Sequence, residues 1–153
     1  METPQWLVKP FDELSTQNLY DILHLRAKVF VVEQDCPYLD VDHYDQKSVH
    51  LMGVADNRVV CYCRLFDARN YFETACIGRV VIDPEYRNKK WGHLLMTEAI
   101  RELYRLFGVQ RIEISAQCYL EQFYASHGFV TISEMYLEDN IPHVRMRLDP
   151  KSS

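Results

Sequence analysis

Three basic residues precede a glycine at the start of a periodic apolar segment. Arg87, Lys89 and Lys90 lie in the stretch DPEYRNKKWGHLLM, directly after the strand formers CIGRVVI. The first amides of a helix have no partner within the helix, and the helix dipole adds partial positive charge at the same end. Basic side chains beside such an end suit phosphate groups. The stretch therefore predicts an anion site, although a solvated charge run would have the same composition.

A second candidate for chemistry is a tyrosine that stands four residues before a Gly-Phe pair. Tyr124 precedes Gly128 and Phe129 in the segment YLEQFYASHGF. A tyrosine hydroxyl that is held at the reacting atoms can donate a proton to a leaving group. A tyrosine on a short helix is otherwise typical of an apolar core, so its spacing alone does not assign it a role.

The elements that must position these residues follow from the hydrophobic periodicity. Helices are expected over residues 15–30, 91–107 and 119–127, a long polar loop over 31–48, and strands over 49–54, 59–66, 74–82, 111–115, 129–136 and 143–148. The strand, helix and strand over 74–115 form a βαβ unit, whose two strands should be parallel. Ligands of such units bind beside the helix N-terminus, which is where the basic stretch falls.

Two segments resemble the GNAT family of acetyl-CoA-dependent N-acetyltransferases. VVIDPEYRNKKWGHLLM is similar to the acetyl-CoA loop of the family, Arg/Gln-x-x-Gly-x-Gly/Ala, with Arg87 and Gly92 at its ends and Lys90 in place of the middle glycine. AQCYLEQFYASHGF is similar to the second motif, with Tyr124 in register and Gln117 in place of the more common asparagine. Together with LRAKVFVVEQDCPYLDVDHYD, these features resemble the ElaA-type branch, in which this lysine and this glutamine are expected.

The resemblance covers nearly the whole chain and implies a single GNAT N-acetyltransferase domain over residues 1–153. The expected fold class is α/β (α+β), with a mixed central sheet of about six to seven strands, about four flanking helices and a parallel βαβ cofactor site. The implied activity is transfer of an acetyl group from acetyl-CoA (coenzyme A) to an amine by direct attack.

The resemblance also implies how the cofactor is held. The strand before the loop would pair with the amides of the pantetheine arm as an added strand does, and an amide near Val80 would hold the developing oxyanion. Gly92 would let backbone and phosphate approach closely, while Lys90 would point its side chain outward and still offer its amide. Tyr124 would be the general acid. The expected cofactor-binding residues are Val80, Val81, Ile82, Arg87, Asn88, Lys89, Lys90, Trp91, Gly92, Gln117 and Tyr124.

The general base is left open, because the strand glutamate usual in the family is absent from ACIGRVVI. Glu33, in the loop after the first helix, and His143, at the start of the last strand, are the first candidates for a base or for acceptor contacts. Glu113 and His50 rank behind them, and a chain of water molecules is an alternative.

Other charged and sulfur-containing residues favour structural roles. Arg64 and Arg79 lie on neighbouring strands, where charge pairing within the sheet explains them better than an anionic acceptor does. The acidic run DVDHYD fails as a calcium loop because Asp45 occupies the required glycine position. Cys61 and Cys63 alternate along one strand with no paired motif elsewhere, which indicates buried thiols rather than zinc ligands. No metal site is predicted.

Composition limits the classes of partner. The chain has 153 residues, of which 48% are hydrophobic and 25% charged, and a net charge of −5. This composition is typical of one globular domain and argues against general nucleic-acid affinity. No apolar run is long enough to span a membrane, and the five cysteines and the lack of a signal-like N-terminus favour the cytoplasm. The expected partner is a small-molecule amine or a peptide amine, with no nucleic acid and no membrane, and a homodimer is one of the oligomeric states open to the chain.

Two classes of function remain open. The first is an acetyl-CoA-dependent N-acetyltransferase. The second is a non-catalytic acyl-CoA-binding or sensory module on the same fold. A variant of the first is an acyltransferase that uses another acyl donor. The acidic stretch faintly resembles the N-terminal signature of acyl-homoserine-lactone synthases, which share the fold but use acyl carriers and need more chain for the acyl pocket. Release of free thiol from acetyl-CoA in the presence of a panel of amines separates the two classes.

Overall fold

The computed structural model describes residues 2–151 and contains one mixed sheet. The strands are β1 (Gln5–Pro10), β2 (Val49–Ala55), β3 (Arg58–Phe66), β4 (Ala75–Ile82), β5 (Ile112–Gln117), β6 (Val130–Thr131), β7 (Tyr136–Glu138) and β8 (Ile141–Leu148). The α-helices are α1 (Thr16–Arg26), α2 (Trp91–Phe107) and α3 (Glu121–Ala125). Shorter helical turns are the π-helical η2 (Ala27–Glu33) and the 3-10 turns η1 (Phe11–Glu13), η3 (Asp45–Lys47), η4 (Pro84–Lys89) and η5 (Cys118–Leu120).

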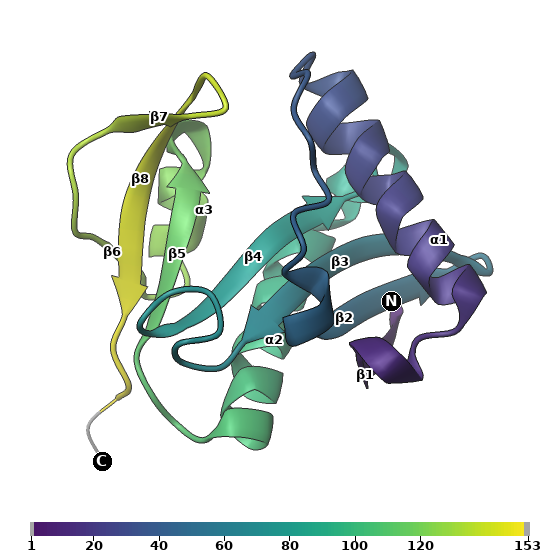
Figure 1. Ribbon diagram of the computed structural model, residues 1–153, viewed down its shortest axis with the longest axis horizontal. Coiled ribbons are helices and arrows are strands. Elements are labelled where there is room, and N and C mark those ends of the chain that lie inside the picture. The colour runs from purple at the N-terminus through teal and green to yellow at the C-terminus, as the bar shows by residue number, and fades with distance from the viewer. Residues whose placement is uncertain (1, 152–153) are drawn as a thin grey trace.

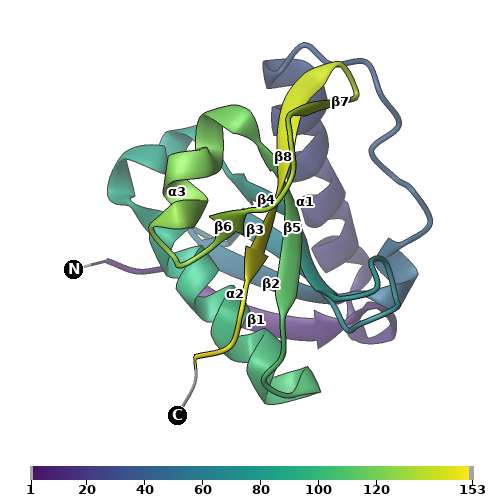
Figure 2. The same cartoon turned by 90° about the vertical axis from the view of Figure 1, so that its left-hand side faces the viewer.

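The sheet separates two helical layers (Figure 2). The helix α1 packs on β3 and β4 from one face, and α2 packs on the same strands from the other. Strand β3 serves both layers because its side chains alternate: Cys61 and Cys63 join the core beneath α2, whereas Tyr62 joins the core beneath α1. This double burial is why β3 reads as a nearly continuous apolar run.

The first helix begins where the sequence predicts. The Ser15 hydroxyl accepts a hydrogen bond from the amide of Asn18 at 2.9 Å, and the Asn18 side chain accepts one from the amide of Ser15 at 3.1 Å. This reciprocal capping box satisfies two amides that the helix leaves unpaired. The end differs from the expectation, because the wider turn η2 carries the helical path to Glu33 and so covers residues 31–33 of the predicted loop.

The βαβ unit is confirmed, and its two strands diverge. Strands β4 and β5 are parallel neighbours, but they pair only at Ala75 with Ile112 and at Cys76 with Glu113. Beyond these pairs β4 runs toward the α1 side and β5 toward β8 (Figure 1). The sheet therefore has two parts, which we call its wings: β1 to β4 form one wing and β5 to β8 the other. The wings are joined only where β4 and β5 pair.

The element count differs from the expectation in two places. Eight strands are present rather than six or seven, because β1 was not predicted and the expected strand over 129–136 is divided into β6 and β7. The strand β1 is a sheet-edge strand that contains Lys9 and ends at Pro10, so it lacks the apolar alternation that marks a half-buried strand. Three α-helices and several single turns take the place of the four expected helices. Within residues 2–151, no helix has both the length and the apolar character that crossing a bilayer requires.

Candidate functional site

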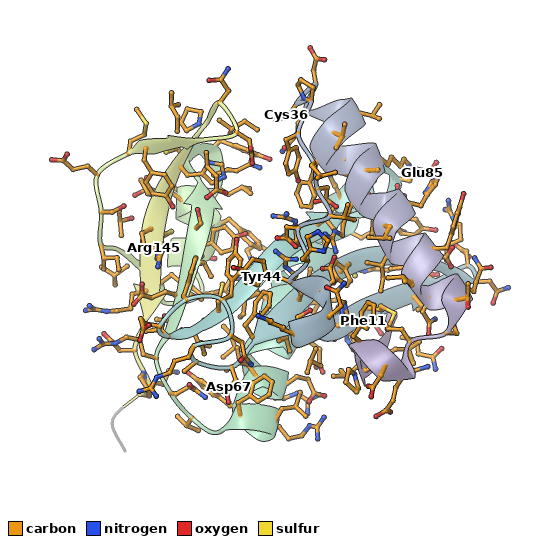
Figure 3. The ribbon with its side chains drawn as sticks, in the orientation of Figure 1. Phe11, Cys36, Tyr44, Asp67, Glu85 and Arg145 are labelled. Carbon is orange, nitrogen blue, oxygen red and sulfur yellow. The ribbon has the colours of Figure 1, made fainter. Side chains whose placement is uncertain are left out.

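A cavity of about 460 Å³ lies between the two wings of the sheet. The β4 segment 77–82 forms one wall, and residues of β5, α3 and the β7–β8 hairpin form the other. The segment after η2 reaches the second wall, where Gln34 Nε2 lies 3.1 Å from Gln117 Oε1 and Cys36 Sγ lies 3.2 Å from the carbonyl oxygen of Asp139. Figure 3 shows Cys36 on the α1 side and Arg145 on the β8 side of this opening.

Most of the predicted cofactor-binding residues come together in this cavity. Those that line it are Val80, Val81, Ile82, Arg87, Lys90, Gly92, Gln117 and Tyr124. Asn88, Lys89 and Trp91 do not line it. The Trp91 indole is buried against the Tyr86 ring, with centroids 5.2 Å apart, so its side chain belongs to the core and only its backbone is left for a ligand.

Strand β4 is irregular where it borders the cavity. Tyr62 pairs with Val81 whereas Arg64 pairs with Gly78, so Arg79 and Val80 together oppose one residue of β3. Arg79 has a φ of 51°, and a bulge of this kind bends the strand and re-aims its peptide groups. Because β5 has already diverged here, the peptide groups of β4 that face it have no strand partner. An extended chain of amides fits such an edge as an added strand.

The start of α2 borders the same cavity. Lys90 is its N-cap residue, with a φ of 61°, and no side chain of the described residues caps the first turn. The first amides of α2 therefore remain available to an anion. A left-handed backbone is the conformation that glycine adopts most readily, which accounts for the glycine that is usual at this position.

The candidate base Glu33 forms an ion pair with Arg87 of the predicted acetyl-CoA loop. Its carboxylate accepts two hydrogen bonds from Arg87, at 2.6 and 2.7 Å, and these lower its pKa. Glu33 does not line the main cavity. A carboxylate that is stabilised in its charged form by a guanidinium is a weak proton acceptor, so the geometry does not favour Glu33 as the base.

Tyr124 has the properties of a proton donor. It is buried on α3, borders the cavity and packs edge-on against Phe123, with ring centroids 5.1 Å apart. Burial raises the pKa of its hydroxyl, so that the group stays protonated near neutral pH.

His143 is the candidate base that shares the cavity with Tyr124. It lies on β8 opposite Gln117, and its ring stacks on Tyr136 with centroids 6.1 Å apart. Its Nδ1 atom is 2.7 Å from the carbonyl oxygen of Ile141, and its Nε2 atom is 3.5 Å from Glu138 Oε2. The sequence analysis did not select Glu138. The signal that could have found it is the Asp139-Asn140 pair, which suits a two-residue hairpin turn and so brings Glu138 near His143.

The two lower-ranked candidates have partners of their own. Glu113 accepts a hydrogen bond from Arg145 across the β5–β8 pair, at 3.1 Å. His50 is fully buried outside the cavity, with Nδ1 2.6 Å from the Tyr62 hydroxyl and Nε2 2.9 Å from the carbonyl oxygen of Asp45. Burial lowers the pKa of His50, as expected for a neutral structural histidine.

The acidic run is part of a buried ion cluster of three arginines and three aspartates. The members of this cluster are Arg26, Arg64, Arg79, Asp40, Asp42 and Asp45. Asp45 Oδ1 accepts hydrogen bonds from two of the arginines, at 2.7 and 2.8 Å. Within the described residues, no group of three or more potential metal ligands is assembled. The sequence analysis expected charge pairing within the sheet. Arg64 and Arg79 instead pair with aspartates of the loop and turn that precede β2, so their partners are structural but lie outside the sheet.

Comparison with known proteins agrees with this geometry. A family model described as an acetyltransferase (GNAT) domain matches residues 19–150. The chain belongs to the GNAT family. This GNAT chain is 36% identical to the protein ElaA of Escherichia coli, over 93% of its own length and 94% of that protein, and 42% identical to a UPF0039 protein of Schizosaccharomyces pombe, over 97% and 99%. The ElaA-type resemblance is thereby confirmed.

Solved structures give the same assignment for the fold of this GNAT chain. The crystal structure of Escherichia coli ElaA superposes with a TM-score of 0.89 at 34% identity, covering 95% of this chain and 99% of that one. An acyl-CoA N-acyltransferase from Pseudomonas aeruginosa superposes with a TM-score of 0.88 at 40% identity, covering 94% and 99%. The mixed α+β fold with a parallel βαβ site is the predicted one.

Proposed function

We propose that this GNAT protein is an N-acetyltransferase that moves an acetyl group from acetyl-CoA to an amine by direct attack. The observation that carries the proposal is a single cavity that joins the unpaired edge of β4, the uncapped start of α2 and the Tyr124 side chain. A long polyanion that ends in a thioester needs an anion site for its phosphates, an extended edge for its arm and a proton donor at its thioester. Five free cysteine thiols support a reducing compartment, and we place the activity in the cytoplasm.

The residues present fit coenzyme A. The peptide groups around Val80 to Ile82 would pair with the amides of the pantetheine arm, and the first amides of α2 would hold the pyrophosphate. Arg87 and Lys90 add positive charge at that end. When bound, the coenzyme supplies an activated acyl carbonyl at the inner end of the arm.

The side chains of the cavity can then manage the protons of the transfer. A peptide amide of the β4 bulge near Val80 would donate to the oxygen that becomes negative as the amine attacks. The new nitrogen–carbon bond replaces the carbon–sulfur bond. Tyr124 gives its proton to the departing sulfur, and His143 takes the proton that the amine must lose.

Free-thiol release from acetyl-CoA with a panel of amines tests the proposal. The parent protein should turn over at least one amine, and Tyr124→Phe should lower kcat by roughly a hundredfold, because thiolates leave fairly readily even without an acid. The KM for acetyl-CoA should change only a few-fold, since the proton is transferred in the transition state. Thermal melting of the variant confirms that it is folded.

Two outcomes contradict the proposal. A parent protein that binds acetyl-CoA but releases no thiol with any amine is a non-catalytic acyl-CoA-binding module. A parent that releases thiol only from longer acyl-CoA esters is an acyltransferase with another donor. If folded Tyr124→Phe matches the parental rate, Tyr124 is a packing residue and the acid lies elsewhere.

A further inference from the structure

We propose that Glu138 and His143 form the amine-binding site of this cavity and select primary alkylammonium groups that carry no carboxylate beside the nitrogen. This inference rests on the proposed acetyl transfer and names its acceptor class. The two residues lie on the β7–β8 hairpin, whose turn residues Asp139 and Asn140 have φ values of 49° and 66°. These angles are typical of a tight two-residue turn, which fixes the two strands in register.

The hydrogen bonds of His143 leave one donor missing. A backbone carbonyl can only accept, so the Nδ1 atom that faces the carbonyl of Ile141 at 2.7 Å must carry the proton. In the neutral ring Nε2 is then a lone pair, and it faces the carboxylate of Glu138 at 3.5 Å. In this neutral form two acceptors face each other, and a hydrogen lies between them only if His143 is protonated or an outside donor enters. The His143 side chain is only 8% exposed, whereas the Glu138 side chain is 46% exposed, so a donor can reach the pair from the Glu138 side.

The rest of Glu138 is held in place. The Ser115 hydroxyl lies 3.1 Å from Glu138 Oε1 and 2.5 Å from the Tyr136 hydroxyl. One carboxylate oxygen is therefore oriented from β5, and the other stays open beside Nε2. Both Glu138 and His143 border the cavity that also contains Tyr124.

An alkylammonium group supplies the missing donor. Its three N–H bonds can reach both the Nε2 lone pair and the Glu138 carboxylate. His143 Nε2 then accepts one proton from the ammonium, which frees the nitrogen lone pair for attack, and Glu138 stabilises the resulting imidazolium. The nitrogen–acyl bond forms, the carbon–sulfur bond breaks and the sulfur takes the Tyr124 proton. The second proton that the nitrogen loses returns to the Tyr124 oxygen through water, and His143 releases its proton to solvent.

The charge of this wall excludes amines with a neighbouring carboxylate. Glu138 and Asp139 both border the cavity. Of the cations that also border it, Arg79 is paired with Asp40 at 2.8 Å and Asp42 at 3.3 Å, Arg87 is paired with Glu33 at 2.6 Å, and Lys90 lies at the start of α2, where the coenzyme phosphates would bind. An α-amino acid would bring its own carboxylate against two acids with no uncommitted cation beside them. A diamine or a lysine side chain brings none.

Steady-state thiol release with 1,4-diaminobutane, Nα-acetyl-lysine amide and alanine tests the site in the parent, Glu138→Gln and Glu134→Gln. Glu134 is an exposed acid on the segment before the hairpin and does not border the cavity, so its variant is a matched control for charge. We expect the parent to use one or both alkylamines and to reject alanine. Glu138→Gln should raise the KM of the alkylamine by roughly 10- to 100-fold, the usual worth of a hydrogen bond to a charged group, while Glu134→Gln matches the parent.

The comparison of the two alkylamines separates a small diamine from a lysine side chain as the source of the ammonium group. His143→Gln should lower kcat and remove the acidic limb of the pH–rate profile, which a purely structural role would not do. Turnover by Glu138→Gln with parental KM values, or use of alanine as readily as diaminobutane, overturns the inference and leaves the acetyl transfer intact.

If the protein releases no thiol with any amine, a measurement of amine binding still tests the site. Calorimetry with 1,4-diaminobutane on the protein saturated with coenzyme A reports amine binding without any reaction. If the parent binds the diamine and Glu138→Gln does not, the amine site stands even though the proposed transfer fails. If neither binds it, the amine site is overturned independently of the transfer.

Discussion

The buried ion cluster and the Glu138–His143 pair both hold ionisable side chains at short distances, yet only in the cluster is every carboxylate paired with arginines. Asp40, Asp42 and Asp45 each accept from two arginines, at distances of 2.6 to 3.3 Å. On the hairpin, the Nε2 atom of His143 and the carboxylate of Glu138 face each other as acceptors. Carboxylates therefore have different roles in the two regions, and the identity of their partners separates these roles.

The difference also appears in where the two groups lie. The cluster ties the loop after η2 to β3 and β4, so its charges hold distant segments of chain together. The hairpin pair links only neighbouring strands and borders the cavity. We infer that loss of a cluster residue mainly affects stability, whereas loss of a hairpin residue mainly affects turnover.

The largest expected effect is the loss of stability in Arg64→Met. Arg64 is buried and donates to both Asp42 and Asp45, so its removal leaves two carboxylates with fewer donors. Breaking a buried ion pair typically costs about 3–5 kcal/mol, and we expect the lower end because Arg26 and Arg79 still contact these aspartates. Urea denaturation of the parent and the variant measures the change in the free energy of unfolding.

The matched control for this variant is Arg101→Met. Arg101 is an exposed arginine of α2 with a single partner, Glu98, so its loss should change stability by only a small fraction of the Arg64 effect. Equal effects of the two substitutions would show that the cluster has no special structural role. Per folded molecule, thiol release by Arg64→Met should stay near the parental rate.

The sequence predicted the part of this comparison that depends on local pattern. Gly92, Gln117 and Tyr124, which line the cavity, were assigned to the cofactor site because their motifs resemble those of the GNAT family, and the periodicity of the chain predicted the elements that carry them. The βαβ order and the helix boundary at Ser15 follow from the same kind of signal.

The remainder depends on contacts that no local pattern encodes. Glu33 meets Arg87 across 54 positions of the chain, and Ser115 meets Glu138 across 23. Whether a glutamate becomes an ion-pair partner or an open acceptor is decided by which donor the fold brings to it. Sequence reasoning could therefore propose Glu33 and His143 as candidates but could not rank them.

A smaller effect is expected in the acid stability of Asp42→Asn. Burial alone would raise the pKa of Asp42, but hydrogen bonds and charge from Arg64 outweigh it and lower the pKa to about 2, from 3.8. A lowered carboxyl pKa stabilises the fold above about pH 4, and this contribution is lost as the pH falls toward about 2. The parent should therefore lose about 2 kcal/mol more than Asp42→Asn over this range.

Urea denaturation at several pH values between 2 and 7 checks this difference. Asp149→Asn is the control, because Asp149 is an exposed carboxylate that is also paired with arginines, Arg111 and Arg147. The loss of unfolding free energy of Asp149→Asn at acidic pH should be close to that of the parent, since solvent screens exposed pairs. If Asp42→Asn loses as much stability as the parent between pH 7 and pH 2, the acid sensitivity belongs to another group of the cluster.

The smallest expected effect concerns Glu33→Gln, which lies outside the main cavity and contacts Arg87 at its border. There the carboxylate has its donor, because Arg87 holds it at 2.6 and 2.7 Å and both side chains are partly exposed. A coenzyme phosphate must compete with that carboxylate for the guanidinium. Glutamine keeps the shape and removes the charge, so acetyl-CoA should bind a few-fold more tightly at low salt, and the gain should shrink as salt screens the exposed charges.

Calorimetric titration with acetyl-CoA and steady-state kinetics separate this role from that of a base. Glu85→Gln is the matched control, since Glu85 is another exposed acid paired with an arginine, Arg58, and lies outside the cavity. It should leave both acetyl-CoA affinity and kcat unchanged. For Glu33→Gln we expect tighter binding with kcat within about twofold of the parent, because a general base would contribute at least a hundredfold. A hundredfold fall in kcat would instead make Glu33 the base and remove His143 from that role, even though Arg87 stabilises the charged form of Glu33.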